Sequence, residues 1–165
     1  DAGECNEGFL CLGGATSPSP PDGLGWAAAT DPTSALLNGR CPTGHYCPRG
    51  TLTPVPCPIG TLADQMGGSN ISHCRPCTPG YYCLRVGLSA PAGPCAPGYY
   101  CPGGEIVPNP ANQTCPAGTY CPEGSSFPIG CPAHHYQVAG ASAKCFPCPA
   151  GYQCPVNIAF PEICP

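Results

Sequence analysis

The stretch CPTGHYCPRGTLTPVPCP, Cys41 to Pro58, returns in nearly the same form as CPAGTYCPEGSSFPIGCP, Cys115 to Pro132. In both copies a cysteine and a proline open the stretch, a glycine and a tyrosine follow, and a second cysteine closes the motif after five intervening residues. Repetition of a short segment at regular spacing is the signature of a repeat protein. The chain is therefore predicted to be a tandem array of small units.

The spacing of the cysteines extends this array along most of the chain. Six pairs have five residues between the opening and the closing cysteine: Cys5 and Cys11, Cys41 and Cys47, Cys77 and Cys83, Cys95 and Cys101, Cys115 and Cys121, Cys148 and Cys154. Two longer units open in a similar way and close later, Cys57 to Cys74 and Cys131 to Cys145. We call these eight units repeats and name each by its opening cysteine.

Each repeat carries a pattern that predicts a tight turn. The third residue after the opening cysteine is glycine in seven repeats and histidine in the other: Gly8, Gly44, Gly60, Gly80, Gly98, Gly118, His134 and Gly151. Proline restricts the backbone before the turn, and glycine readily adopts the left-handed conformation. We interpret the tyrosines that follow as packing against a neighbouring disulfide or proline, with a binding surface as the alternative. These are Tyr46, Tyr82, Tyr100, Tyr120 and Tyr136.

The composition indicates that disulfides replace a conventional core. The 165 residues include 17 Cys, 26 Pro and 23 Gly, whereas Leu, Ile, Val and Phe together number only 24. Cysteine at this density indicates an extracellular chain, secreted or at the cell surface, because disulfides persist in oxidising compartments. A net charge of −4 with five basic residues argues against nucleic acid or an anionic membrane as a partner. The first residues lack a signal-peptide pattern and no run is long enough to span a bilayer, so we expect a segment without its own anchor.

The spacing leaves the disulfide connectivity open. The simplest pairing closes each repeat on itself and uses sixteen cysteines. The crossed alternative joins neighbouring short repeats, for example Cys77 with Cys95 and Cys83 with Cys101. We favour local closure, because the crossed scheme needs short repeats in even numbers. From Cys41 onward the opening cysteines follow one another in steps of 16 to 20 residues, and a further step of 16 reaches Cys164, which we interpret as the opener of a ninth repeat.

The motifs CPAGTYC, CTPGYYC, CAPGYYC and CRPCTPGYYC resemble the cysteine-rich repeats called ephrin-receptor-like, which are relatives of tumour-necrosis-factor-receptor modules. The resemblance covers Cys41 to Pro165. It implies an elongated, disulfide-laddered array of short β-hairpins and loops with little helix, as in receptors and in large surface glycoproteins of algae and protists. The frequent pairs with five intervening residues depart from the receptor modules, so their connectivity and ligand surfaces are not carried over.

Residues 12–40 interrupt the rhythm, so we divide the chain into a first repeat unit (1–11), an insertion (12–40) and the tandem repeats (41–165). The insertion lacks cysteine and holds the single tryptophan, Trp26. Asp31 and Pro32 could start a short helix that ends at Gly39. Because a helix of two turns is unstable alone, Trp26, Leu36 and Leu37 need a partner surface, either the first repeats or an adjacent subunit.

Several positions are candidates for glycosylation. Asn70 and Asn112 begin the sequons Asn-Ile-Ser and Asn-Gln-Thr, both in loops between cysteines. The segment TSPSPP, which comprises Thr16, Ser17, Pro18, Ser19, Pro20 and Pro21, resembles the Ser-Pro motifs of hydroxyproline-rich glycoproteins. A plain polyproline II spacer is the alternative for this segment.

Patterns for catalysis or metal binding are weak. His134 and His135 stand beside Tyr136 within a repeat, and no Ser/His/Asp or paired-carboxylate spacing recurs. The pairs CRPC, Cys74 to Cys77, and CFPC, Cys145 to Cys148, have zinc-like spacing, and His73 precedes one of them. Each of these cysteines, however, already closes one repeat or opens the next. We therefore expect no enzyme, no cofactor and no metal.

Two classes of function fit these observations. The first is a structural extracellular glycoprotein, a disulfide-stapled segment of a filament, flagellar hair or cell-surface coat, whose partners are copies of itself or neighbouring segments of the assembly. The second is the stalk or ligand-binding ectodomain of a receptor or adhesion protein. Receptor interfaces are rich in aromatic and arginine anchors, and this chain has one Trp and four Arg, which favours the first class.

Overall fold

The protein is represented by a computed structural model, and the description is of the part of the chain that comprises residues 4–11, 17–20 and 39–165. Its secondary structure consists of short antiparallel hairpins and one turn of 3-10 helix, η1 (Ile71–His73). The seven hairpins pair β1 (Phe9–Leu10) with β2 (Gly39–Arg40), β3 (His45–Tyr46) with β4 (Val55–Pro56), β5 (Thr61–Leu62) with β6 (Arg75–Pro76), β7 (Tyr81–Tyr82) with β8 (Gly93–Pro94), β9 (Thr119–Tyr120) with β10 (Ile129–Gly130), β11 (His135–Tyr136) with β12 (Phe146–Pro147), and β13 (Tyr152–Gln153) with β14 (Glu162–Ile163). The expected fold class, small disulfide-rich repeats of short hairpins with little helix, is confirmed.

Every hairpin is built in the same way within a repeat. The first strand follows the turn residue, and the second immediately precedes the next opening cysteine, as in the pairing of Tyr120 with Ile129. The Cys95 repeat has a single bridge at this place, between Tyr99 and Thr114. Each strand has two residues, and in most repeats a proline, which cannot donate to a strand ladder, directly follows the opening cysteine.

Cysteine sulfur takes the place of a conventional core. Among the described residues, the buried apolar side chains outside cysteine are Leu10, Leu62 and Ala63, together with the proline rings of Pro20, Pro42 and Pro110. The buried cysteines are Cys5, Cys41, Cys47, Cys57, Cys77, Cys83, Cys95, Cys101, Cys115, Cys121, Cys131 and Cys154. A chain with so few aliphatic residues therefore excludes water mainly around its disulfides.

The two long repeats differ from the short ones at the place where a short repeat has its closing cysteine. We define the closing position as the sixth residue after the opening cysteine; short repeats have cysteine there, whereas the long repeats have Ala63 and Gln137, both buried. The side-chain amide of Gln137 donates to the hydroxyl oxygen of Ser142 and, at 2.7 Å, to the carbonyl oxygen of Lys144. Its oxygen accepts from the backbone N–H of Ala139 at 3.2 Å. The buried side chain of Gln137 thus fixes the long loop of its repeat through these hydrogen bonds.

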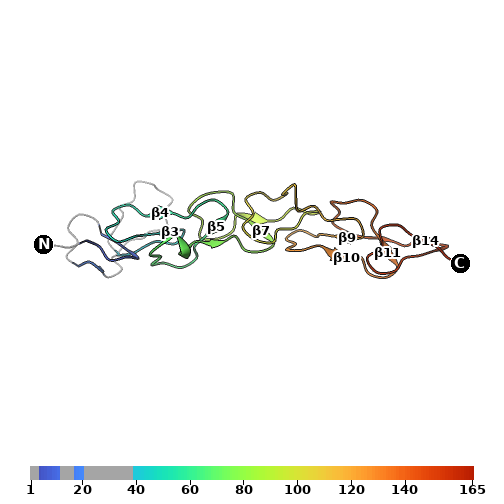
Figure 1. Cartoon of the computed structure of the whole chain (residues 1–165), viewed down its shortest axis with the longest axis horizontal. Helices are drawn as coiled ribbons and strands as arrows, with labels where there is room; N and C mark the ends of the chain where they lie inside the picture. Colours follow the sequence, from blue (N-terminus) through green and yellow to red (C-terminus); the bar gives the residue numbers. More distant parts are fainter. Residues whose placement is uncertain (1–3, 12–16, 21–38) are drawn as a thin grey trace. The chain divides into compact units, whose positions relative to one another are not determined.

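The chain divides into two compact parts, each of which is described by itself. Figure 1 labels strands of both, with β3 and β5 in the first part and β9 and β10 in the second. The first part comprises Asp1–Arg75 and Arg85–Ala90, and the second comprises Pro76–Leu84 and Pro91–Pro165. The Cys77 repeat contributes to both parts, because Arg85–Ala90 belongs to the first part and the rest of the repeat belongs to the second. Residues 31–38 of the helix expected between Asp31 and Gly39, together with Trp26, lie outside the described residues, and so do Leu36 and Leu37. Gly39, the expected end of the helix, lies in β2.

Candidate functional site: the junctions between repeats

Consecutive repeats are joined through the backbone of the turn position, the third residue after the opening cysteine. In the Cys95 repeat, the N–H of Gly98 donates to the carbonyl oxygen of Cys121, the closing position of the next repeat, at 2.8 Å. The carbonyl oxygen of Gly98 accepts from the N–H of Cys115, the next opening cysteine, at 3.0 Å. The same N–H contact joins Gly8 to Cys47, Gly44 to Ala63, Gly80 to Cys101, Gly118 to Gln137 and His134 to Cys154. We call these bonds the turn ladder.

A second set of backbone bonds, the loop ladder, uses another left-handed residue that follows the closing position. The N–H of Gly124 donates to the carbonyl oxygen of Cys95, the opening cysteine of the preceding repeat, at 2.9 Å. The N–H of Cys101 donates to the carbonyl oxygen of Ser125 at 2.9 Å. The residues equivalent to Gly124, which we call the loop position, are Gly50, Gly67, Gly87, Gly104, Ala141 and Asn157, and all have positive φ.

Both ladders recur with the same donors and acceptors. All four bonds are present between the repeats Cys41 and Cys57, Cys77 and Cys95, Cys95 and Cys115, Cys115 and Cys131, and Cys131 and Cys148. Because the donors and acceptors are backbone groups, the junction tolerates different side chains at the same place, as Ala63 and Gln137 show. The junctions are thus a repeated interface that depends on backbone shape.

The turn position also contacts the repeat that lies two further along the chain. A Cβ atom on Gly118 would stand 2.5 Å from the carbonyl oxygen of Asn157, and one on Gly8 would stand 2.6 Å from that of Gly67. Gly44, Gly80 and Gly98 meet the loop-position carbonyls of Gly87, Gly124 and Ala141, also at less than 3.0 Å. Glycine is therefore required at the turn position for two reasons: the backbone has a positive φ, and there is no room for a Cβ atom. The sequence pattern predicts the first requirement, whereas the second follows only from the stacking of the repeats.

The loop position itself was missed by the sequence analysis, although a signal for it exists. In the short repeats Cys41, Cys95 and Cys115, glycine stands three residues after the closing cysteine, as Gly50, Gly104 and Gly124. Ala141 and Asn157 take this place elsewhere, with φ of 58° and 61°. Because the offset varies and the residue is not always glycine, spacing alone makes the pattern hard to find.

The sixteen cysteines before Cys164 form eight disulfides, each closed within one repeat. The crossed pairs considered from the sequence, such as Cys77 with Cys95, are not those of the structure. Cys164 is free and exposed. Its backbone N–H donates to the carbonyl oxygen of Gly151 at 3.1 Å, which is the bond that opening cysteines make in the turn ladder. Cys164 therefore occupies the place of an opening cysteine.

The five tyrosines interpreted as packing residues, Tyr46, Tyr82, Tyr100, Tyr120 and Tyr136, are all partly buried. Tyr136 contacts Phe146 across its hairpin, with ring centroids 6.3 Å apart. By contrast, Tyr152 is more exposed. These positions agree with packing inside the repeats rather than with a row of exposed rings.

The candidate glycosylation sites occupy different surroundings. Asn70 and Asn112 are both exposed. Asn70 caps η1, where its side-chain oxygen accepts from the N–H of Ser72 at 2.9 Å. In the Ser-Pro segment, only residues 17–20 are described: the carbonyl oxygen of Pro18 accepts from the N–H of Asn6 at 2.8 Å, and Pro20 is buried. These four residues lie against the Cys5 repeat, while Thr16 and Pro21 fall outside the described residues.

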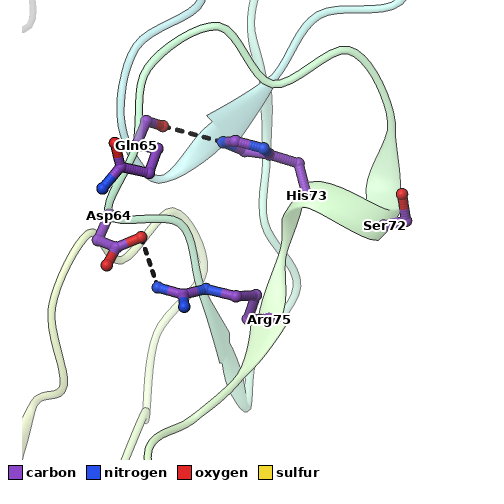
Figure 2. Close-up of a pocket in the computed structure, with 5 residues that line it drawn as sticks. All are labelled: Asp64, Gln65, Ser72, His73 and Arg75. Atoms are coloured by element: carbon purple, nitrogen blue, oxygen red, sulfur yellow. Dashed lines mark hydrogen bonds and ion pairs between the residues drawn. The ribbon is translucent and has the colours of Figure 1, made fainter.

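A pocket of about 300 Å³ in the first part is lined by Asp64, Gln65, Ser72, His73 and Arg75 (Figure 2). Arg75 pairs with Asp64 at 2.5 Å, and Nε2 of His73 lies 3.0 Å from the carbonyl oxygen of Gln65. Figure 2 shows that Ser72 points away from both contacts. The cation is paired with the carboxylate and the imidazole with the backbone, so these five residues form no nucleophile–base pair.

The remaining candidates for chemistry are dispersed. The CRPC and CFPC cysteines, Cys74, Cys77, Cys145 and Cys148, all belong to disulfides. His135 places Nδ1 3.3 Å from the carbonyl oxygen of Ala133, and His134 is exposed at a turn position. Within residues 4–11, 17–20 and 39–165, no group of three His, Cys, Asp or Glu residues is arranged to hold a metal ion.

No family model matches the sequence, and no curated protein matches it. The class of protein is therefore defined by the structure alone. The eight disulfides and the repeated hairpins are those of an extracellular, disulfide-stabilised structural protein. In the part of the chain that the structure describes, no helix is long and apolar enough to cross a membrane.

Proposed function

We propose that the chain is a segment of a structural extracellular glycoprotein that forms a filament, a flagellar hair or a cell-surface coat. In this role each repeat is a cross-linked building block, and the number of repeats sets the reach of the segment. Oligosaccharides on Asn70 and Asn112, both on exposed loops, supply hydration that the few charged residues cannot.

The observation that carries the proposal is the recurrence of the same four backbone bonds at five junctions. In repeat proteins each unit contacts mainly its neighbours, and stability is approximately a sum of unit and junction terms. An interface made by the backbone can be copied many times while the side chains vary. This property suits a protein whose task is mechanical.

The proposal assigns no catalysis to the chain and no cofactor. In the pocket of the first part, Arg75 and Asp64 neutralise each other, and Ser72 has no contact with His73 that could activate its hydroxyl. The partners that we propose are copies of the chain or neighbouring segments of the same assembly. The resemblance to ephrin-receptor-like repeats is part of the proposal and is consistent with either an assembly or a stalk.

The second class, a stalk or ligand-binding ectodomain of a receptor or adhesion protein, requires a contiguous apolar surface that a partner can cover. Several large apolar side chains are exposed, among them Phe127 at 64%, Phe160 at 66% and Ile163 at 75%. Exposed apolar groups of this size are typical of surfaces that bind another protein when they are contiguous. Alanine substitution of Phe127 and Phe160 would weaken ligand capture in the second class.

Electron microscopy of the native, unreduced material tests the proposal. Regular filaments, with density beyond the side chains of Asn70 and Asn112, are expected. Isolated particles that do not assemble at any concentration would contradict a filament and direct attention to ligand capture by an ectodomain. Reduced material serves as the control, because assembly that survives reduction would not depend on the disulfide-stapled repeats.

A further inference from the structure

His134 occupies a turn position with the same backbone geometry as the glycines. Its N–H donates to the carbonyl oxygen of Cys154 at 2.8 Å, and its own carbonyl oxygen accepts from the N–H of Cys148 at 2.7 Å. Its φ is 65°, which is left-handed and uncommon for a residue with a side chain. The backbone at position 134 is therefore that of a turn glycine, and the Cβ atom of His134 lies where a Cβ on those glycines would lie.

This place is normally filled by the repeat two further along. Gly118 shows the rule: the loop-position carbonyl of Asn157 approaches it so closely that no Cβ fits. The turn glycines from Gly8 to Gly118 are buried. For His134 the repeat two further along is the one that Cys164 would open. The loop-position carbonyl of that repeat would have to overlap the Cβ atom of His134.

We infer that His134 is a steric stop: its side chain prevents a ninth repeat from stacking on the Cys148 repeat in the way that the earlier repeats stack on one another. The inference concerns stacking alone and does not rest on the proposed function. The turn ladder can begin, because the N–H of Cys164 already binds the carbonyl oxygen of Gly151. The loop ladder cannot follow, because the carbonyl group at the loop position of the ninth repeat would overlap the Cβ atom of His134. Whatever follows the Cys148 repeat must therefore use a different junction.

The test supplies a ninth repeat made of the chain's own sequence. Residues 117–130, AGTYCPEGSSFPIG, are appended after Pro165, so that Cys164 and Pro165 open a copy of the Cys115 repeat whose copied Cys121 can close on Cys164. Two extended chains are compared, one with His134 and one with His134→Gly. Intact mass under non-reducing conditions verifies that the ninth disulfide has formed in both.

Amide hydrogen exchange at Cys154 reports the loop ladder, because a regular ninth repeat would accept its N–H just as Ser142 accepts that of Cys121. With His134 we expect the Cys154 amide to exchange as fast as in the chain without the extension. With His134→Gly we expect exchange to slow by at least about 100-fold, toward the rate of Cys121. The Gly151 amide, which belongs to the turn ladder, serves as the internal reference in both chains.

Matched controls separate the stop from other effects. His135→Gly removes the neighbouring imidazole and is expected to leave Cys154 unprotected in the extended chain. His134→Gly without the extension is expected to change nothing at Cys154. Equal protection of Cys154 with His134 and with His134→Gly would overturn the inference. So would an absence of protection in both extended chains, because His134 would then not be the obstacle.

Discussion

Gly118 and Asn157 belong to repeats that are two apart, yet the carbonyl oxygen of Asn157 stands 2.5 Å from the point where Gly118 would carry a Cβ atom. Gly151 has nearly the same φ, 85° against 80°, but no atom of the described residues lies within 4 Å of its corresponding point. The two glycines therefore share a backbone conformation and differ in their neighbours. Substitutions at these two glycines therefore separate the free-energy cost of backbone strain from that of a steric clash.

Gly118→Ala is expected to destabilise the protein more than Gly151→Ala. Both variants force alanine into the left-handed region, which costs roughly 1–2 kcal/mol. Gly118→Ala also pushes a methyl group against the Asn157 carbonyl, which adds about 1–3 kcal/mol, as overpacking does. Denaturant unfolding of the two unreduced variants measures the difference. Equal free energies of unfolding would show that turn glycines are needed for φ alone.

Gln137→Ala is expected to loosen the long loop of the Cys131 repeat. The substitution removes the side-chain bonds to the carbonyl oxygen of Lys144 and the N–H of Ala139, and the Lys144 oxygen then keeps only its bond from the Ser142 hydroxyl, so the loss costs about 1–3 kcal/mol. Faster amide exchange at Ala139 is the local measurement. Gln153→Ala is the control: Gln153 is exposed, and its change is expected to stay within about 0.5 kcal/mol. Unchanged exchange at Ala139 would count against the structural role of Gln137.

Full reduction is expected to unfold the chain. Each disulfide between cysteines six apart contributes about 2 kcal/mol on the chain-entropy account, and Cys57–Cys74, with a separation of 17, contributes about 3 kcal/mol. The buried groups are also mainly these cysteines, so little apolar core is left once they are open. Limited proteolysis detects the loss. Alkylation without reductant modifies only Cys164 and is expected to preserve protease resistance.

Asn70→Gln and Asn112→Gln are each expected to remove one oligosaccharide from protein made in a eukaryotic secretory host. Both asparagines are exposed, so an attached sugar reaches solvent without disturbing a disulfide. Intact mass spectrometry before and after enzymatic removal of N-linked sugars checks each site. A single variant with the mass of the fully glycosylated chain, corrected for the substitution, would eliminate that site.

Arg75→Ala is expected to change the free energy of unfolding by less than about 1 kcal/mol. The ion pair with Asp64 is solvent-exposed, with side-chain exposures of 61% and 45%, and water screens such pairs. Thermal unfolding at low and high salt measures the effect. Arg49→Ala, which breaks an exposed pair with Glu4, is the matched control. A loss of several kcal/mol for Arg75→Ala alone would reveal a structural role for the pocket.

The repeated motif predicted the units and the tight turn after each opening cysteine, whereas the short hairpins were expected only from the resemblance to ephrin-receptor-like repeats. These features are local: the opening and closing cysteines of a short repeat are six residues apart, and proline and glycine restrict the backbone between them. The place of Cys164 could also be read from spacing, and its bond to Gly151 is the one that an opening cysteine makes. The buried amide of Gln137 could not be anticipated, because glutamine at that point reads as an ordinary loop residue.

The sequence by itself determined the repeat units and the tight turn inside each, because cysteine, proline and glycine act on the backbone within a few residues. Only the tertiary structure decided what happens between repeats. The loop position pairs with the opening cysteine of the preceding repeat, and its carbonyl packs on a turn glycine two repeats before, as Asn157 does with Cys131 and Gly118. Such contacts depend on how the repeats stack and not on spacing along the chain. For that reason the steric effect of His134, which in the sequence is one unusual turn residue, can be inferred only from the contacts of the turn glycines that precede it.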